Sequence, residues 1–122
     1  MLNDHEINNP DFSGKSERQI KIGLEIRNIA QIFFQKESSG ASLITVTKTD
    51  ISKDLKNTNI YITVLPKNKE LQALSFAKRM RTDLRTEIKN KLSIRTIPKV
   101  EIKIDEGEKE RQKIDKILKN IK

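Results

Sequence analysis

Residues 60–65 read Ile60-Tyr61-Ile62-Thr63-Val64-Leu65, an unbroken run of β-branched, aromatic and aliphatic side chains. Two isoleucines and a valine occupy one face of this run, and Tyr61, Thr63 and Leu65 occupy the other. Alternation of this kind is typical of a β-strand. Pro66 follows directly and ends the strand, because proline has no backbone N–H to donate to a neighbour. The rest of the fold is predicted by working outward from this strand.

A second strand pattern lies upstream. Ile44 and Val46 alternate with threonines, and a polar stretch then leads to Ile51. The connecting residues 52–58 are rich in Asp, Asn and Lys, which are common in turns. A β-hairpin is the simplest pairing of the two strands.

The first helix is predicted between these strands and the N-terminus. Apolar residues recur at spacings of three and four from Arg18 to Glu37, which indicates an amphipathic helix of about five turns. Ser16 is placed as its N-cap. Ser38-Ser39-Gly40 is expected to end it.

Downstream of Pro66, the pattern predicts a long helix, a third strand and a last helix. Asn68 is the expected cap of the long helix, which reaches about Leu92. Gly107 is expected to separate the third strand from the last helix. The strand alternates Val100, Ile102 and Ile104 with charged residues, and the last helix carries Ile114, Ile117, Leu118 and Ile121.

The predicted order is therefore α-β-β-α-β-α, an α+β fold with a small three-stranded sheet and helices packed on one face. The second and third strands are expected to be parallel, joined by a helical crossover. We expect residues 1–15 to form a flexible acidic lead-in and residues 16–122 to form one domain, in agreement with the length of the chain.

Composition excludes several classes of function. The chain has no cysteine, and His5 is its single histidine, so thiolate chemistry, histidine metal sites and histidine-dependent triads are excluded. Asp50 and Asp54 are interpreted as turn residues and not as an acid–base pair. No apolar run approaches the roughly 20 residues of a membrane span. We expect a cytoplasmic, non-enzymatic protein without a metal or cofactor.

Positive charge is concentrated in one segment. The chain has 25 Lys and Arg against 17 Asp and Glu, a net charge of +8. Seven basic and two acidic residues fall between 78 and 95, so this segment carries five of the eight net charges. On one helix, Lys78, Arg81, Arg85 and Lys89 form a row about 16 Å long beside the apolar stripe. Such a row fits consecutive phosphates of a nucleic acid, and arginine adds bidentate contacts.

Arg79 and Arg95 extend this candidate RNA-binding set, and Lys53, Arg18 and Lys21 are lesser candidates. Three interpretations of the basic row stay open. It contacts RNA, it lies on an anionic membrane surface, or it is an ordinary solvated helix face of a lysine-rich chain. The absence of tryptophan makes the membrane interpretation the weaker binding hypothesis.

Several collinear motifs resemble the ribosome-binding factor A (RbfA) family. The hairpin Ile51-Ser52-Lys53-Asp54-Leu55, followed by residues 60–65, is similar to its V-S-R-D-L … V-Y-V-S-V-L segment. Residues 94–98 resemble its L-R-x-V-P entry to the last strand. Residues 114–118 resemble its C-terminal I-D-x-L-L.

The resemblance implies a KH-like fold of type II topology and a protein that binds the free 30S subunit through 16S rRNA. A monomer is the default expectation. It also implies late maturation of that rRNA, including its 5′ end, and support of growth in the cold. Members of the family bend the long helix at an Ala-x-Gly kink, where this chain has Met80-Arg81-Thr82. Because the glycine is absent, we expect the helix to bend less sharply or to run straight through.

Overall fold

The computed structural model describes residues 14–37, 40 and 42–120. Its elements are α2 (Glu17–Glu37), β1 (Leu43–Ile51), β2 (Asn57–Leu65), the 3₁₀ helix η2 (Lys67–Lys69), α3 (Glu70–Arg79), α4 (Arg81–Lys91), β3 (Lys99–Ile104) and α5 (Glu106–Asn120). Residues 1–13 of the predicted lead-in, Ser38, Ser39 and Ile121 lie outside the described residues. The α-β-β-α-β-α order is confirmed, with the second helix in two parts.

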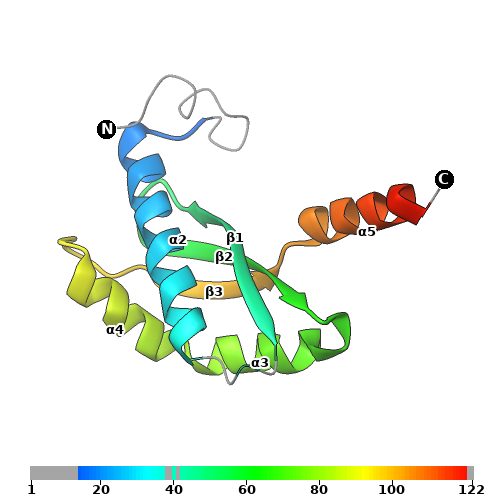
Figure 1. Cartoon of the computed structure of the whole chain (residues 1–122). Helices are drawn as coiled ribbons and strands as arrows, with labels where there is room; N and C mark the ends of the chain where they lie inside the picture. Colours follow the sequence, from blue (N-terminus) through cyan, green and yellow to red (C-terminus); the bar gives the residue numbers. More distant parts are fainter. Residues whose placement is uncertain (1–13, 38–39, 41, 121–122) are drawn as a thin grey trace.

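The sheet has the strand order β1-β2-β3, so β2 is central and the other two strands are edges (Figure 1). β1 pairs with β2 antiparallel, as the hairpin prediction required, with a register shift between Val46 and Lys48. β2 pairs with β3 in parallel, which places Ile60 opposite Ile102. The alternation read from the sequence therefore gives one continuous apolar face across all three strands.

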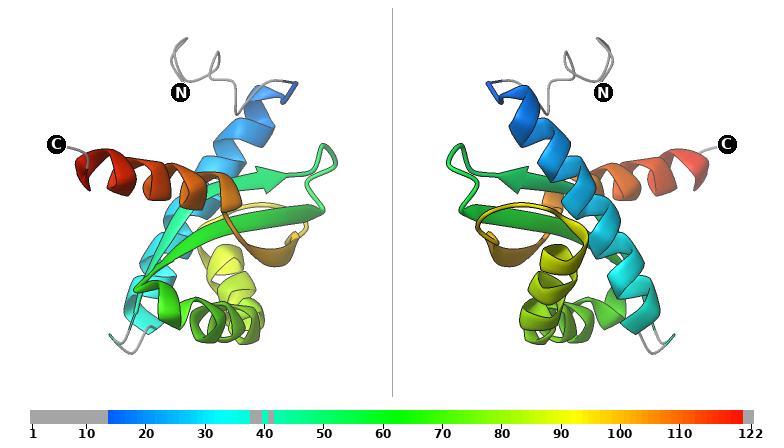
Figure 2. Two further views of the ribbon diagram at one scale, coloured as in Figure 1. Left: turned by 90° about the vertical axis from the view of Figure 1, so that its right-hand side faces the viewer. Right: turned by 90° about the vertical axis from the view of Figure 1, so that its left-hand side faces the viewer.

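Helices α2, α3 and α4 cover this apolar face, whereas α5 projects away from the sheet (Figures 1 and 2). α2 packs on β1 and on α4, and α3 packs on β2 and β3. The buried core joins residues from these elements; Phe34, Ile26, Ile60, Ile62, Leu84 and Ile88 are each fully buried. Burial of this apolar surface is the main stabilising term of the fold.

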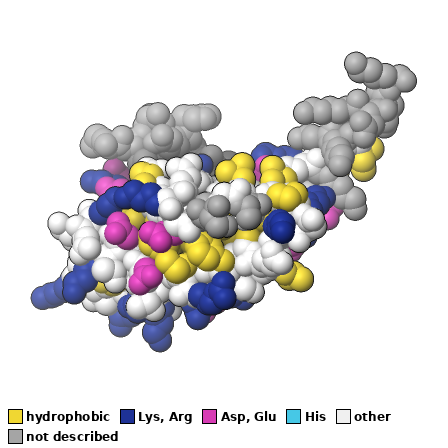
Figure 3. Space-filling model, turned by 60° about the horizontal axis from the view of Figure 1, so that its bottom comes forward, with side chains coloured by type: hydrophobic (Ala, Val, Ile, Leu, Met, Phe, Trp, Pro, Cys, Tyr) yellow, Lys and Arg dark blue, Asp and Glu magenta, His cyan; other side chains and the backbone are white. Residues whose placement is uncertain are grey.

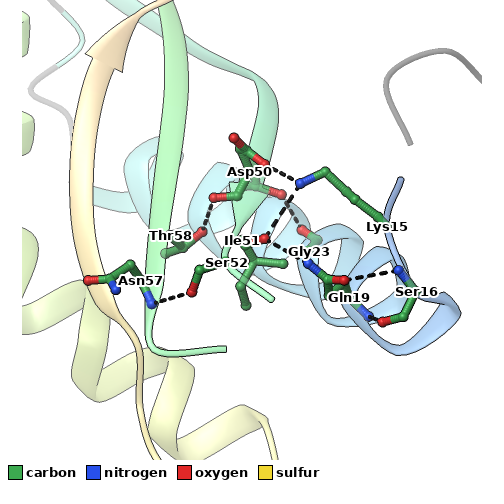
Figure 4. A network of polar contacts seen from close by, with 10 residues as sticks. Lys15, Ser16, Gln19, Gly23, Asp50, Ile51, Ser52, Asn57 and Thr58 are labelled. Carbon is green, nitrogen blue, oxygen red and sulfur yellow. Dashed lines mark hydrogen bonds and ion pairs between the residues drawn. The ribbon is translucent and has the colours of Figure 1, made fainter. Parts of the chain in front are cut away.

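The N-terminus of α2 carries a capping box. The Gln19 N–H donates to the Ser16 hydroxyl oxygen at 3.1 Å, and the Ser16 N–H donates to the Gln19 side-chain oxygen at 3.0 Å. The Gln19 amide also donates to the Ile51 carbonyl at 3.2 Å (Figure 4). Ser16 is thus confirmed as the N-cap, and the same box attaches the helix to the end of β1.

The prediction of one continuous second helix is wrong. The helical pattern breaks at Met80, which has φ −87° and ψ 5°, and α3 and α4 run in different directions on either side of it (Figure 1). Asn68 is not the cap, because it lies inside η2 and Lys69 holds the N-cap position of α3. The break lets Ala77 and Leu84, both at 0% exposure, reach the core from different helices.

The expected boundary at Gly107 is also wrong, because Gly107 lies in the first turn of α5. Asp105 begins this helix: its carboxylate accepts from the Glu108 N–H at 3.0 Å and from the Thr47 hydroxyl at 2.5 Å. Burial raises the pKa of Asp105, but these hydrogen bonds outweigh it, so the net shift lowers the pKa. A carboxylate cap, rather than a glycine stop, therefore marks the end of β3.

Candidate nucleic-acid interface

Helix α4 keeps the division of charge that the sequence predicted. Leu84 and Ile88 are fully buried at 0% exposure, while Arg81, Arg85 and Lys89 are exposed. At about 100° per residue these three cations follow one edge of the buried stripe, next to the core. The helix thus presents a row of cations to solvent while its neighbouring face packs in the core.

The break at Met80 changes the shape of the predicted row. Lys78 and Arg79 end α3, while Arg81 begins α4, so the cations do not form one straight line. The Arg81 Nε–H donates to the Lys78 carbonyl oxygen at 3.0 Å and bridges the break. The basic residues are therefore gathered around a bend, and we call this set, with the loop residue Arg95, the α3–α4 basic edge. Its members are Lys78, Arg79, Arg81, Arg85, Lys89 and Arg95.

Arg85 has a structural contact that sequence reasoning missed. Its Nε–H donates to the Pro98 carbonyl at 3.1 Å, and its Nη2 donates to the Ile97 carbonyl at 3.4 Å. These bonds hold the 92–98 loop, which carries the exposed Arg95, against α4. A guanidinium has five N–H donors, so Arg85 keeps donors for a phosphate while it positions the loop.

Strand β3 adds charged residues that were not predicted as candidates. Lys99 and Lys103 are exposed on the outer face of the sheet, on either side of Glu101. The Glu101 carboxylate lies 4.0 Å from the Arg81 guanidinium, which brings β3 next to the bend between the helices. The strict alternation of charged and apolar residues in this strand was the signal that could have identified them.

The turn that carries Lys53 is organised by its neighbours. The Asp54 carboxylate accepts from the Ser52 hydroxyl at 2.6 Å and from the Lys56 N–H at 3.0 Å. The Ser52 hydrogen bond is the main cause that lowers the pKa of Asp54. Leu55 follows with φ 63°, a left-handed conformation that is uncommon for a leucine. Asp54 is therefore a turn residue, as predicted, and Lys53 is exposed on the turn. The same prediction is wrong for Asp50, which lies in β1 and pairs with Asn59 of β2.

The other two lesser candidates lie on a different helix. Arg18 and Lys21 are exposed in the first turns of α2. α2 packs on α4, and the two helices run in opposite directions (Figures 1 and 2). Figure 3 shows dark blue lysine and arginine side chains along the lower margin of the face that α3 presents.

Neither a metal-binding cluster nor a membrane-spanning helix occurs among the residues that the structure describes. No cluster of three or more His, Cys, Asp or Glu side chains that could hold a metal ion occurs there. None of the helices described there is long and apolar enough to cross a membrane.

Comparison with known proteins decides the family. The model of the family "Ribosome-binding factor A" matches residues 18–118, which is most of the chain. The chain belongs to the ribosome-binding factor A family. A ribosome-binding factor A from Rhodopseudomonas palustris strain TIE-1 is 29% identical over 125 residues, covering 98% of this chain and 90% of the relative. One from Bradyrhizobium sp. strain ORS 278 is 30% identical over 112 residues, covering 88% and 81%.

Solved structures show that ribosome-binding factor A proteins share this fold, which confirms the KH-like prediction. The crystal structure of ribosome-binding factor A from Thermus thermophilus has a TM-score of 0.62 at 19% identity, covering 69% of this chain and 92% of that chain. A homology model of the T. thermophilus protein, fitted into the cryo-EM map of a 30S–RbfA complex, has a TM-score of 0.58 at 20% identity. It covers 65% of this chain and 86% of that chain.

Proposed function

We propose that this chain is a ribosome assembly factor that binds the free, immature 30S subunit through 16S rRNA and assists its late maturation, including 5′-end processing. The match of the family model to residues 18–118 is the observation that carries the proposal. The protein acts as a cytoplasmic monomer without a cofactor, by binding and not by catalysis, and supports growth in the cold.

The α3–α4 basic edge supplies the phosphate contacts in this proposal. Two features support it: α4 exposes three cations beside a buried stripe, and the break at Met80 gathers Lys78 and Arg79 around the same bend. Cations that neutralise phosphates release counterions, which favours binding and makes it dependent on salt. Lys53, Arg18 and Lys21 are proposed as peripheral contacts.

Co-sedimentation tests the function directly. The protein is centrifuged with purified 30S subunits, with complete 70S ribosomes and with vesicles of anionic phospholipid. We expect association with 30S subunits, and much less with 70S ribosomes or vesicles. Equal association with 30S and 70S particles would refute the assembly role and indicate a generic RNA-binding module. Preference for the vesicles would support the membrane interpretation and refute the assembly role.

A further inference from the structure

A pocket lies at the opposite edge of the sheet from the α3–α4 basic edge. The first half of α2 and the second half of β1 form it, and Tyr61 from β2 contributes to its wall. Its volume is about 420 Å³, which is in the range of small-ligand sites. We call it the α2–β1 pocket. Because β1 and β3 are the two edges of the sheet, the pocket is separate from the α3–α4 basic edge. The proposed peripheral contacts Arg18 and Lys21 lie on the same helix as the pocket but do not line it.

Three cations from separate parts of the chain converge on this pocket. Lys15 precedes α2, Arg27 lies on α2, and Lys48 lies on β1. Among the described residues that line the pocket, Asp50 is the one carboxylate, and it pairs with the Lys15 ammonium (Figure 4). The residues that line the pocket therefore carry two more positive than negative charges, which favours binding of an anion.

Lys48 is held in place by an aromatic ring. Its ammonium nitrogen lies 4.9 Å from the centroid of the Tyr61 ring, within the range of a cation–π interaction. This contact restrains a side chain that is otherwise flexible, which lowers the entropy cost of binding an anion. Lys48 lies next to the register shift in β1, where the extra residue changes the pairing with β2.

The rest of the pocket favours a ligand larger than a simple anion. Leu24 and Tyr61 line the same pocket as the cations, so one ligand can meet both apolar side chains and positive charge. We propose that the α2–β1 pocket binds a nucleotide, with Arg27 and Lys48 contacting its phosphate and Leu24 and Tyr61 contacting its base or ribose. The nucleotide is free in solution or is part of an RNA strand. This site does not depend on the function proposed for the basic edge.

The chain contains its own probe for this site. Tyr61 is the single tyrosine, and the chain has no tryptophan. The tyrosine fluorescence of the protein therefore comes from a residue that lines the pocket and changes when a ligand binds beside it. The full-length protein is titrated with uridine monophosphate, with inorganic phosphate and with a single-stranded hexauridylate. N-acetyltyrosinamide in parallel corrects for light absorbed by the nucleotide. We expect a saturable change with uridine monophosphate. Tighter binding of hexauridylate identifies an RNA strand as the source, and equal or weaker binding identifies a free nucleotide.

Two variants distinguish binding at this pocket from a general effect of the protein's positive charge. Arg27→Gln should weaken binding of uridine monophosphate about ten-fold, since it removes a charged hydrogen-bond donor. Lys36→Gln removes one charge from the same helix outside the pocket and should leave the affinity unchanged. Thermal melting checks that both variants are folded.

The proposal has distinct failures. It is wrong if uridine monophosphate and hexauridylate both give no saturable change, if Arg27→Gln binds like the wild type, or if inorganic phosphate binds as tightly as the nucleotide. If no nucleotide binds but the protein still associates with 30S subunits, only the proposal for the α2–β1 pocket is refuted. Loss of 30S binding with the Tyr61 signal intact would overturn only the proposed function.

Discussion

The salt dependence of binding to 30S subunits tests the α3–α4 basic edge most sharply. Arg81 and Lys89 are exposed on α4, on the same edge of the buried Leu84–Ile88 stripe. Arg85 is left in place because it also holds the 92–98 loop through two carbonyls. The double variant Arg81→Gln, Lys89→Gln therefore removes two candidate phosphate contacts and leaves the core and the loop in place. It also removes the exposed hydrogen bond from Arg81 to the Lys78 carbonyl.

The expected size of the effect follows from counterion release. Each phosphate contact contributes about 0.7–0.9 to the slope of log K against log salt concentration. Removing two contacts should reduce the magnitude of the slope by about 1.5. The free energy of unfolding should change by no more than about 0.5 kcal/mol, because both side chains are exposed. Filter binding to purified 30S subunits between about 50 and about 200 mM salt measures the slope.

A third substitution works in the opposite direction. The Glu101 carboxylate lies 4.0 Å from the Arg81 guanidinium and competes with phosphate for it. Glu101→Gln should therefore strengthen binding to 30S subunits and steepen the slope by less than about 1. The same substitution in the Arg81→Gln variant should have a smaller effect if Arg81 contacts RNA, and an equal effect if only net charge matters.

The matched control is Lys36→Gln, Lys67→Gln, which removes the same charge from exposed positions outside the basic edge. Its slope should stay close to that of the wild type. If the slope of log K against log salt concentration decreases equally in the two double variants, net charge governs binding and the assignment of the basic edge is refuted.

Two further predictions concern stability. Asp105→Ala should lower the free energy of unfolding by about 2 kcal/mol at neutral pH, because it removes a helix cap and the Thr47 hydrogen bond. The pKa of Asp105 is lowered by folding, so its contribution is complete above the unfolded pKa of about 4 and is lost as pH falls through the lower folded pKa. Urea unfolding at neutral and acidic pH should show this loss, and a difference independent of pH would contradict it. Gly23→Val should cost about 1–3 kcal/mol in urea unfolding, because a Cβ there already lies 3.3 Å from the Thr49 hydroxyl oxygen. A stability equal to that of the wild type would show that α2 moves away from β1 without cost.

The strands and the first helix were predictable because their signals are local. The alternation in residues 60–65 places Ile60 and Ile62 on one face, and both are fully buried. Ser16 caps α2 through a reciprocal bond with a residue three positions away. The exposed edge of α4 follows from the same reasoning, since helical periodicity alone separates Arg81 from Leu84.

The errors arose where a local signal was incomplete. Without a glycine near residue 82, no pattern in the sequence favoured a break in the second helix. Met80 nevertheless adopts a conformation near the bridge region, which non-glycine residues tolerate. At the other boundary, Gly107 resembled a stop signal, but the Asp105 carboxylate accepts the Glu108 N–H and so begins α5 before that glycine.

The sequence by itself determined the order of the elements, the buried faces of the strands, α2 and α4, and the segment that carries most of the positive charge, because each depends on residues a few positions apart. The apolar residues predicted on the last helix, Ile114, Ile117 and Leu118, are exposed on α5. Only the tertiary structure decided the bend at Met80 and the α2–β1 pocket. The bend forms because α3 packs on the sheet while α4 packs on α2 as well, so the two halves bury their apolar stripes against different surfaces. The pocket forms because packing of α2 on β1 brings Lys15, Arg27 and Lys48 together from segments that no sequence period connects.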